Sequence, residues 1–209
     1  PLDQTTRYEV DACGQPVAIL DALGRRKTLQ WDGAGNLVSY TDCSGQVSRM
    51  GYDLLGRLTH SVDALGQRTD YRFDAQGRLT ALRTPDGATQ TYEWDGEGRL
   101  LSHTDALGAQ TRWRYNAAGD VLERTDALGQ RLAYAYDAAD RLLSLTNENG
   151  ELTWIAYDVL DRLTDEIGFD GRHQRYVYNA AGELTHLVEA GGSHLGPGKL
   201  TRFARDALG

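Results

Sequence analysis

The sequence is poor in the residues that normally fill a deep apolar core. Only three of its 209 residues are phenylalanine and one is methionine, whereas 11 are tyrosine and four are tryptophan. Rings with a polar edge suit strands that are buried on one face and exposed on the other. The chain also has no run of 18 apolar residues, so we predict no membrane span, and it shows no signal-peptide pattern.

Signals of catalysis and of nucleic-acid binding are missing as well. The net charge is −8, and the 22 lysines and arginines are spread along the chain rather than gathered in a basic stripe. We therefore expect no nucleic-acid partner. The five histidines stand at no zinc-ligand spacing, and the chain has no catalytic triad pattern, phosphate loop or dinucleotide fingerprint. We expect no catalytic, cofactor-binding or metal-binding residue, and hence no enzyme.

What the chain does have is a 21-residue repeat in nine copies. Each copy opens with an aromatic residue followed by an acid or its amide, and Val10-Asp11 fills that place in the first copy. The later pairs are Trp31-Asp32, Tyr52-Asp53, Phe73-Asp74, Trp94-Asp95, Tyr115-Asn116, Tyr136-Asp137, Tyr157-Asp158 and Tyr178-Asn179. A chain built from one short unit acts as an array, either as a surface or as a container.

Two glycines recur at fixed places when the aromatic residue is counted as position 1. Position 15 is glycine in all nine copies and position 5 in seven, with Asp140 and Asp161 in the other two. Each closes a D-x-x-G pattern or a near relative, in which the aspartate accepts a backbone hydrogen bond and the glycine adopts positive φ. We predict two hairpin turns per repeat, type I with a following bulge. The predicted turn glycines include Gly35, Gly56, Gly66, Gly77, Gly87, Gly98, Gly108, Gly119 and Gly129.

The segments between the turns have the length of ordinary strands. Positions 20 and 1 are aromatic or large and apolar, and they alternate with positions 19 and 21, which are often polar. This alternation is typical of a half-buried antiparallel strand. Position 7 is leucine or valine in eight copies and should lie opposite position 1. The predicted packing residues are Trp31, Tyr52, Phe73, Trp94, Tyr115, Tyr136, Tyr157, Tyr178, Leu58, Leu79, Leu100, Leu142 and Leu163.

The pattern predicts an all-β chain of tandem β-hairpin repeats. One bulge per repeat, in the turn at positions 2–5, would keep the aromatic side chains on one face, and it requires that the turn at positions 12–15 lacks an extra residue. About eighteen short strands in one meander do not stay flat, so we expect a curved, spiralling antiparallel sheet. The chain lacks the 3.6-residue periodicity of helical solenoids and the motifs of leucine-rich repeats and calcium β-rolls. A β-propeller is the weaker alternative.

The repeats occupy residues 1–192, with nine units counted from residue 10. We expect an irregular insertion or long turn at 193–204 and the start of another repeat at 205–209. Both ends fall inside a repeat, which suggests a segment of a longer chain. Cys13 and Cys43 lie in turns at opposite edges, about 20 Å apart for strands of this length, so we predict two free thiols, as suits a chain made in a reducing cytosol.

The residues of the repeat resemble a known family. The run YDLLGRLT from Tyr52 to Thr59, followed by DALGQRT from Asp63, resembles the YD repeat of Rhs proteins. The resemblance covers roughly residues 8–192 and resumes at 203. It implies a segment of a β-cocoon, a large shell of spiralling hairpins. In bacterial Rhs proteins and insecticidal toxin-complex subunits that shell encloses a C-terminal toxin until delivery, and animal teneurins use a similar shell in cell adhesion.

Two functions follow from this reading. The first is a structural shell segment whose partners are further repeats and a C-terminal toxin domain of the same parent protein, together with a secretion apparatus or an immunity protein. Such a parent would be made in the bacterial cytoplasm and exported to target cells. The alternative is a module whose exposed tyrosine and tryptophan faces bind carbohydrate or a cell surface. The regular leucine at position 7 favours burial of the rings, and hence the shell.

Overall fold

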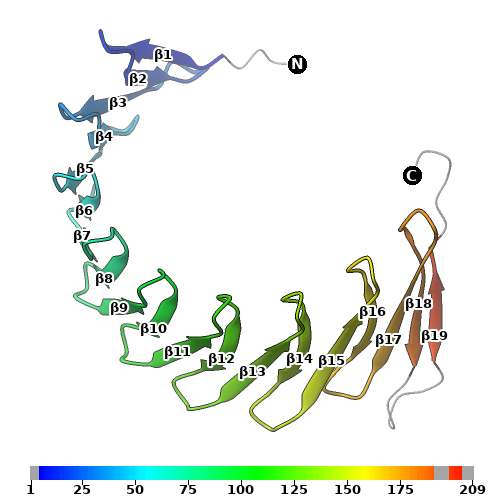
Figure 1. Ribbon diagram of the computed structural model, residues 1–209. Helices are drawn as coiled ribbons and strands as arrows, with labels where there is room; N and C mark the ends of the chain where they lie inside the picture. The colour runs from blue at the N-terminus through cyan, green and yellow to red at the C-terminus, as the bar shows by residue number, and fades with distance from the viewer. Residues whose placement is uncertain (1–4, 191–197, 204–209) are drawn as a thin grey trace. The chain divides into compact units, whose positions relative to one another are not determined.

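The protein is built from antiparallel β-strands. The computed structural model describes residues 5–190 and 198–203, and those residues contain no helix. The prediction of an all-β chain is confirmed. The chain divides into two units, Pro1–Ala109 and Gln110–Gly209, and in each of them every strand pairs with the next one along the chain (Figure 1).

The first unit is a meander of ten strands. Its strands are β1 Arg7–Val10, β2 Pro16–Leu20, β3 Arg26–Trp31, β4 Leu37–Thr41, β5 Val47–Tyr52, β6 Leu58–Val62, β7 Arg68–Phe73, β8 Leu79–Arg83, β9 Thr89–Trp94 and β10 Leu100–Thr104. Each 21-residue repeat thus contributes one strand of five residues and one of six, joined by short turns.

The second unit continues the pattern with nine strands. They are β11 Gln110–Tyr115, β12 Val121–Thr125, β13 Arg131–Tyr136, β14 Leu142–Thr146, β15 Leu152–Tyr157, β16 Leu163–Ile167, β17 His173–Tyr178, β18 Leu184–Ala190 and β19 Lys199–Arg202. Residues 193–197 and 204 of the predicted insertion lie outside the described residues, whereas its described part, 198–203, includes β19, which pairs with β18. The predicted repeat start at 205–209 also lies outside them.

Both turns of the repeat have the same geometry. In the turn that follows β6, the amide of Gly66 donates to the carbonyl of Asp63 at 3.0 Å, and the amide of Asp63 donates to the carbonyl of Gln67 at 3.0 Å. The Asp63 carboxylate accepts the amides of Leu65 and Gln67, each at 2.9 Å. In the other turn type, Gly77 and Asp74 make the same two backbone bonds. These are type I turns closed by a residue of positive φ.

The register shift lies elsewhere than the sequence predicted. Phe73 pairs with Leu79, but Arg72 pairs with Ala81, so Thr80 at position 8 is the extra residue. The pairing of β8 with β9 has no shift. The expected single shift per repeat is present, but the expectation that the 12–15 turn differs from the 2–5 turn was wrong. The extra residue sits inside the strand, where its hydroxyl donates to the carbonyl of Arg72 at 3.2 Å.

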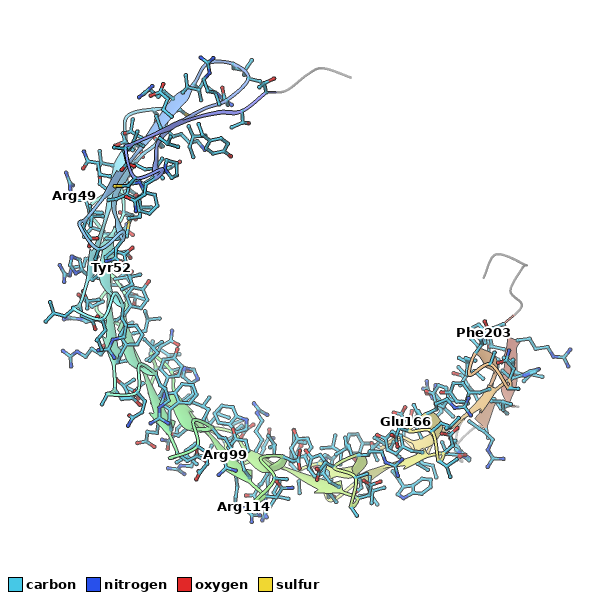
Figure 2. The ribbon with its side chains drawn as sticks, turned by 45° about the horizontal axis from the view of Figure 1, so that its top comes forward. Arg49, Tyr52, Arg99, Arg114, Glu166 and Phe203 are labelled. Carbon is cyan, nitrogen blue, oxygen red and sulfur yellow. The ribbon has the colours of Figure 1, made fainter. Side chains whose placement is uncertain are left out.

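The pairing places the side chains on two unlike faces. Positions 1, 7, 10, 18 and 20 form what we call the aromatic face, and positions 9, 11, 17, 19 and 21 form the charged face. In the second unit, Figure 2 shows Arg114 and Glu166, from the charged and the aromatic face, on opposite sides of the ribbon. Among the described residues Ala18 is the only buried apolar residue, and no large side chain is fully buried. The sheet is therefore one layer thick and must be held together along its length.

Candidate functional site: the latch between hairpins

Consecutive hairpins are joined by backbone pairing at one edge only. Strands β4 and β5 pair at Ser39–Arg49, Tyr40–Ser48 and Thr41–Val47. The pairing ends before Leu37 and Tyr52, which lie at the edge that carries the 2–5 turns. An unpaired edge in a single-layer sheet would leave carbonyl groups without partners and let the hairpins separate there. Side chains close this edge.

The first closing contact comes from the aromatic residue at position 1. The Tyr52 hydroxyl donates to the carbonyl of Leu37, position 7 of the preceding repeat, at 3.0 Å. Tryptophan makes the same bond through its ring nitrogen. The corresponding contacts are Trp31 to Pro16 at 2.8 Å, Trp94 to Leu79 at 2.8 Å, Tyr136 to Val121 at 3.0 Å and Tyr178 to Leu163 at 2.9 Å. Burial raises the pKa of the Tyr136 phenol, as expected for a ring edge that lies against the neighbouring strand.

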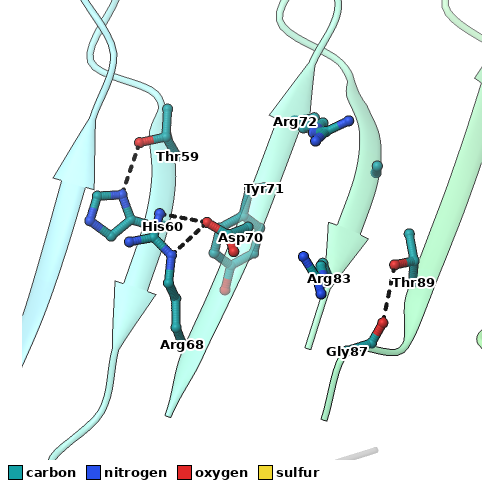
Figure 3. A pocket seen from close by; sticks show the side chains of 10 residues that line it. Thr59, His60, Arg68, Asp70, Tyr71, Arg72, Arg83, Gly87 and Thr89 are labelled. Atoms are coloured by element: carbon teal, nitrogen blue, oxygen red, sulfur yellow. Dashed lines mark hydrogen bonds and ion pairs between the residues drawn. The ribbon is translucent and has the colours of Figure 1, made fainter. Parts of the chain in front are cut away.

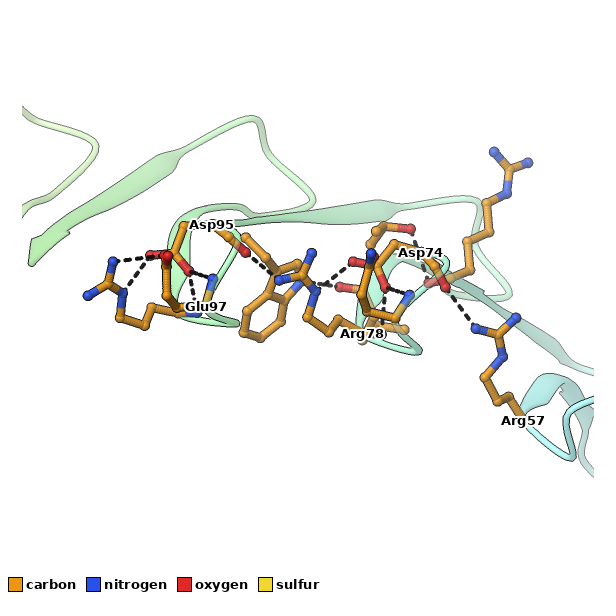
Figure 4. Close-up of polar contacts among 11 residues, drawn as sticks. Arg57, Asp74, Arg78, Asp95 and Glu97 are labelled. Atoms are coloured by element: carbon orange, nitrogen blue, oxygen red, sulfur yellow. Dashed lines mark hydrogen bonds and ion pairs between the residues drawn. The ribbon is translucent and has the colours of Figure 1, made fainter. Parts of the chain in front are cut away.

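The second closing contact comes from arginine at position 6. The Arg57 guanidinium donates through Nε to the Asp53 carboxylate of its own turn at 2.7 Å, and through Nη1 to the carbonyl of Asp74 in the next repeat at 2.8 Å. Arg78 repeats this arrangement with Asp74 and with the carbonyl of Asp95, as Figure 4 shows. Five fixed donors let one guanidinium serve both partners at once.

The same arginine covers the aromatic ring of the next repeat. The guanidinium carbon of Arg57 lies 5.4 Å from the ring centre of Phe73, that of Arg141 lies 5.0 Å from Tyr157, and that of Arg162 lies 4.6 Å from Tyr178. These distances are within the range of cation–π attraction. Where position 1 is phenylalanine and has no polar edge, this contact and the arginine hydrogen bond close the edge instead.

We call this group the inter-hairpin latch: the aromatic residue at position 1, the acid or amide at position 2, the residue at position 6 and the carbonyl at position 7. At least one latch contact closes every junction between repeats that begin at residues 10, 31, 52, 73 and 94 in the first unit. The same holds for the repeats that begin at 115, 136, 157 and 178 in the second.

Positions 2 and 6 exchange their chemistry together. Where position 2 is Asp53, Asp74, Asp95, Asp137 or Asp158, position 6 is arginine. Where position 2 is asparagine, position 6 is an acid, and the side-chain amide then donates to it: Asn116 to Asp120 at 2.8 Å and Asn179 to Glu183 at 2.7 Å. The pair is therefore kept as a donor and an acceptor, whichever side supplies each.

The position 2 carboxylates are held in their charged form. The pKa of Asp158 is lowered, chiefly by the hydrogen bond from the Arg162 side chain, and that of Asp137 is lowered in the same way by Arg141. Backbone amides of the turn also donate to both carboxylates. A hydrogen bond to the ionised form favours ionisation.

The residues singled out in the sequence lie at the turns and in the pairs expected of them. The turn glycines have positive φ: Gly35 85°, Gly56 75°, Gly66 79°, Gly77 85°, Gly87 85°, Gly98 86°, Gly108 84°, Gly119 103° and Gly129 79°. Asp140 and Asp161 take φ of 59° and 61°. The position 1 and 7 partners are Trp31–Leu37, Tyr52–Leu58, Phe73–Leu79, Trp94–Leu100, Tyr115–Val121, Tyr136–Leu142, Tyr157–Leu163 and Tyr178–Leu184. Their importance for stability stays a prediction.

The arginine at position 6 was not predicted from the sequence to have a role, although its coupling to position 2 is visible along the chain. Within the described ranges no group of three or more His, Cys, Asp or Glu could hold a metal ion, and Cys13 and Cys43 are exposed free cysteines. Over residues 5–190 and 198–203, no helix is long and apolar enough to cross a membrane.

The comparison with protein families decides the affiliation of the chain. The RHS Repeat model matches residues 31–64, 52–89, 94–131, 115–152 and 136–173. The chain belongs to the RHS repeat family. Together these matches span residues 31–89 and 94–173, well over half of the chain. No curated protein matches the sequence.

Solved structures of toxin-complex proteins share the fold. The "TcdB2-TccC3-Cdc42" crystal structure aligns over 99% of this chain with a TM-score of 0.80 at 18% identity. The structure of TcdB2-TccC3 without its hypervariable C-terminal region aligns over 99% with a TM-score of 0.56 at 18% identity. A Tc holotoxin pore of Photorhabdus luminescens aligns over 89% with a TM-score of 0.53 at 17% identity. This chain spans 13%, 14% and 12% of those chains.

Proposed function

We propose that this RHS repeat chain is a length of wall in a shell, and that the shell encloses a toxin domain following the repeats in the parent protein. The latch carries this proposal. The residues that recur at fixed spacing bond one repeat to the next, so the repeated chemistry serves continuity of the sheet. The similar solved structures include a Tc holotoxin pore and a protein with a hypervariable C-terminal region, which supports a wall that precedes a variable cargo.

The wall would have the partners and the location of a delivered protein. We propose that its partners are further repeats and a C-terminal toxin of the same chain, with a secretion apparatus or an immunity protein outside it. We propose synthesis in the bacterial cytoplasm and export from there. The curved, spiralling course of the sheet expected from the sequence belongs to the same proposal, because a wall of one layer must close on itself to contain anything. The segment itself would have no catalytic activity.

Carbohydrate binding fits the latch less well. A sugar binds aromatic side chains through their ring faces and through polar groups at their edges. Here the polar edges of Trp31, Tyr52 and Trp94 already donate to backbone carbonyls, and guanidinium groups cover the rings of Phe73 and Tyr178. A sugar would have to displace contacts within the wall.

The test uses the parent protein with its C-terminal domain in place. One variant removes three whole repeats, residues 31–93, and a second changes Arg57, Arg78, Arg141 and Arg162 to glutamine. The matched control changes four arginines of the charged face, Arg49, Arg72, Arg83 and Arg112, to glutamine. Two readouts are followed: the rate at which added protease cuts the C-terminal domain, and the growth of the producing cell.

A shell predicts that the deletion and the latch variant both expose the C-terminal domain to protease, whereas the control stays protected. If the C-terminal domain is equally resistant and harmless without residues 31–93, the shell proposal fails. A glycan-binding assay on the unaltered 209-residue chain separates the alternative: binding that is lost on changing Trp94 to alanine would favour the carbohydrate module.

A further inference from the structure

A groove of about 610 Å³ crosses the charged face of the first unit. Strands β6, β7 and β8, the turn before β9 and the first residue of β9 line it, with His60, Arg68, Asp70, Arg72, Arg83 and Thr89 among the lining residues (Figure 3). None of these side chains belongs to the inter-hairpin latch, because they stand at positions 9, 11, 17, 19 and 21 of their repeats. Because the residue types at these positions differ from copy to copy, the groove is a feature of particular copies and not of the repeat.

Two small residues, Ala81 and Gly51, leave space in and beside the groove. Position 9 on β8 is Ala81, whose small side chain forms part of the floor. On β6 the same position is His60, whose ring extends across Gly51 of the neighbouring strand: a Cβ at residue 51 would lie 2.1 Å from the ring atom Cε1. The glycine gives the imidazole room over β5, so that the ring forms one wall of the groove.

The charged face has the opposite charge balance to the chain as a whole. In the described part of the first unit it carries six arginines but only three acids, whereas the whole chain has a net charge of −8. The arginines are Arg7, Arg26, Arg49, Arg68, Arg72 and Arg83, and the acids are Glu9, Asp70 and Glu93. Most of the negative charge of this unit lies at the turns, where aspartates accept backbone amides.

The two central arginines of the groove are uncommitted. Arg68 is paired with Asp70, at 2.7 Å between Nη2 and Oδ1. The guanidinium groups of Arg72 and Arg83 form no hydrogen bond or ion pair within the part of the chain that the structure describes, and both residues are exposed. Arg72 lies opposite Ala81, and Arg83 lies opposite Asp70. The two arginines are therefore diagonal neighbours, with Cβ atoms within about 8 Å.

We propose that this groove binds an oxyanion, a carboxylate or a phosphate group carried by a ligand, between Arg72 and Arg83. Two planar guanidinium forks on adjacent strands can each donate to one oxygen pair of such a group. Ala81 between them leaves space for it. The Asp70 carboxylate lies at the border of the site, where its negative charge repels the ligand. Its ion pair with Arg68 also keeps that guanidinium from binding the ligand.

The experiment is an isothermal titration of the 209-residue chain at low ionic strength, where screening is weak. One arm uses inorganic pyrophosphate and the other a hexaglutamate peptide, so that the two sources of the oxyanion are told apart. The variants are Arg72→Gln, Arg83→Gln, Asp70→Asn and the matched control Arg49→Gln, which removes the same charge from the same face outside the groove. All four side chains lie on the surface, and thermal unfolding checks that each variant is folded.

Arg72→Gln and Arg83→Gln should each weaken binding by about tenfold, the loss of one charge-assisted contact. Asp70→Asn should tighten it by about threefold, because it frees Arg68 and removes the opposing charge. Arg49→Gln should change it by less than about twofold, since surface charges act weakly at a distance. The same pattern with only one probe supports the site and names the source of the oxyanion.

Three results would overturn the proposal. Absence of binding of both probes to the unaltered chain is the first. An equal loss in Arg49→Gln and Arg72→Gln is the second, because it would reveal attraction to a charged face without a site. Weaker binding in Asp70→Asn is the third, because it would make the carboxylate a ligand-binding group.

Discussion

Removing a single hydroxyl group tests the inter-hairpin latch. Tyr52→Phe keeps the ring that pairs with Leu58 and deletes only the donor to the Leu37 carbonyl, which lies 3.0 Å away. The bond spans the edge where β4 and β5 have no backbone pairing. Losing a hydrogen bond of a half-buried group costs about 0.5–1.5 kcal/mol, and the carbonyl left behind places the value in the upper half of that range.

The matched control is Tyr71→Phe. Tyr71 also lies on the aromatic face, one residue before the charged-face residue Arg72, and its hydroxyl has no hydrogen-bond partner in the residues the structure describes. The control should cost less than about 0.5 kcal/mol, as for a surface change. Tyr52→Phe and Tyr178→Phe lie far apart in the chain and in different units, so their effects should add to within about 0.5 kcal/mol.

The assay is urea unfolding followed by circular dichroism, with amide hydrogen exchange as a local readout. In an array whose repeats contact only their neighbours, a weakened junction opens locally before the chain unfolds. Exchange should therefore quicken in β4 and β5 in Tyr52→Phe and stay unchanged in β17 and β18. Equal effects of Tyr52→Phe and Tyr71→Phe on both readouts would refute the reasoning, because the Tyr52 hydroxyl would then not stabilise the junction.

The remaining predictions concern the turns, the packing pairs and pH. Hydrogen bonds lower the pKa of Asp137 and Asp158, so their contribution to stability is present above the unfolded-state pKa near 4 and is lost as the pH falls through the folded-state pKa. The free energy of unfolding should therefore drop between about pH 4 and pH 2. Asp158→Asn should flatten that dependence on pH. Gly66→Val should destabilise the fold, because φ at this residue is 79° and a β-branched side chain is strained there; an unchanged melting temperature would contradict the turn role. Leu79→Ala should cost about 1–2 kcal/mol, below the range for a fully buried leucine, because the residue is half-buried. Cys13 and Cys43 should both react with a thiol reagent in the folded protein without reductant; protection of either one would contradict its exposure.

The 21-residue period was sufficient to predict most of the fold. Positive φ is tolerated by glycine and, less well, by aspartate, so the D-x-x-G pattern predicts a turn at Gly66 and equally at Asp140. The structure has φ of 79° and 59° at these two residues. The cross-strand pair of Phe73 and Leu79 follows from the spacing of a hairpin whose turn is known.

The position of the register shift could not be predicted, because no residue type marks it. Position 8 is threonine in four copies, and in three of them, Thr59, Thr80 and Thr185, the hydroxyl donates to the position 21 carbonyl of the facing strand at 2.9–3.2 Å. Leu101 and Leu143 fill the same position in other copies. A feature that accepts threonine and leucine alike leaves no signal in one sequence.

The latch escaped prediction for a different reason. Asp53 and Arg57 are four residues apart, which suggests a contact within one turn, and such a pair on a surface contributes little. The structure adds what sequence spacing does not show: the free end of Arg57 reaches the carbonyl of Asp74, 17 residues onward. Contacts between repeats become visible only when the register of the whole sheet is known.

A single-layer wall changes what the recurring residues have to do. In a globular domain a buried core holds distant parts of the chain together, but here no large side chain among the described residues is fully buried. Each repeat must therefore be fastened to the next by contacts of its own. At the edge that carries the 12–15 turns, backbone pairing joins the repeats, as between Ser39 and Arg49. At the edge that carries the 2–5 turns, the inter-hairpin latch joins them. Because position 6 can be Arg141 beside Asp137 or Glu183 beside Asn179, the donor and the acceptor can be exchanged within the turn. The arginine form also donates to a backbone carbonyl of the next repeat, as Arg141 does to Asp158. Junctions that follow an acid at position 6 lack the guanidinium contact and keep the aromatic donor, as Tyr136 after Asp120 does. We therefore expect these junctions to be the first to open when the sheet is destabilised.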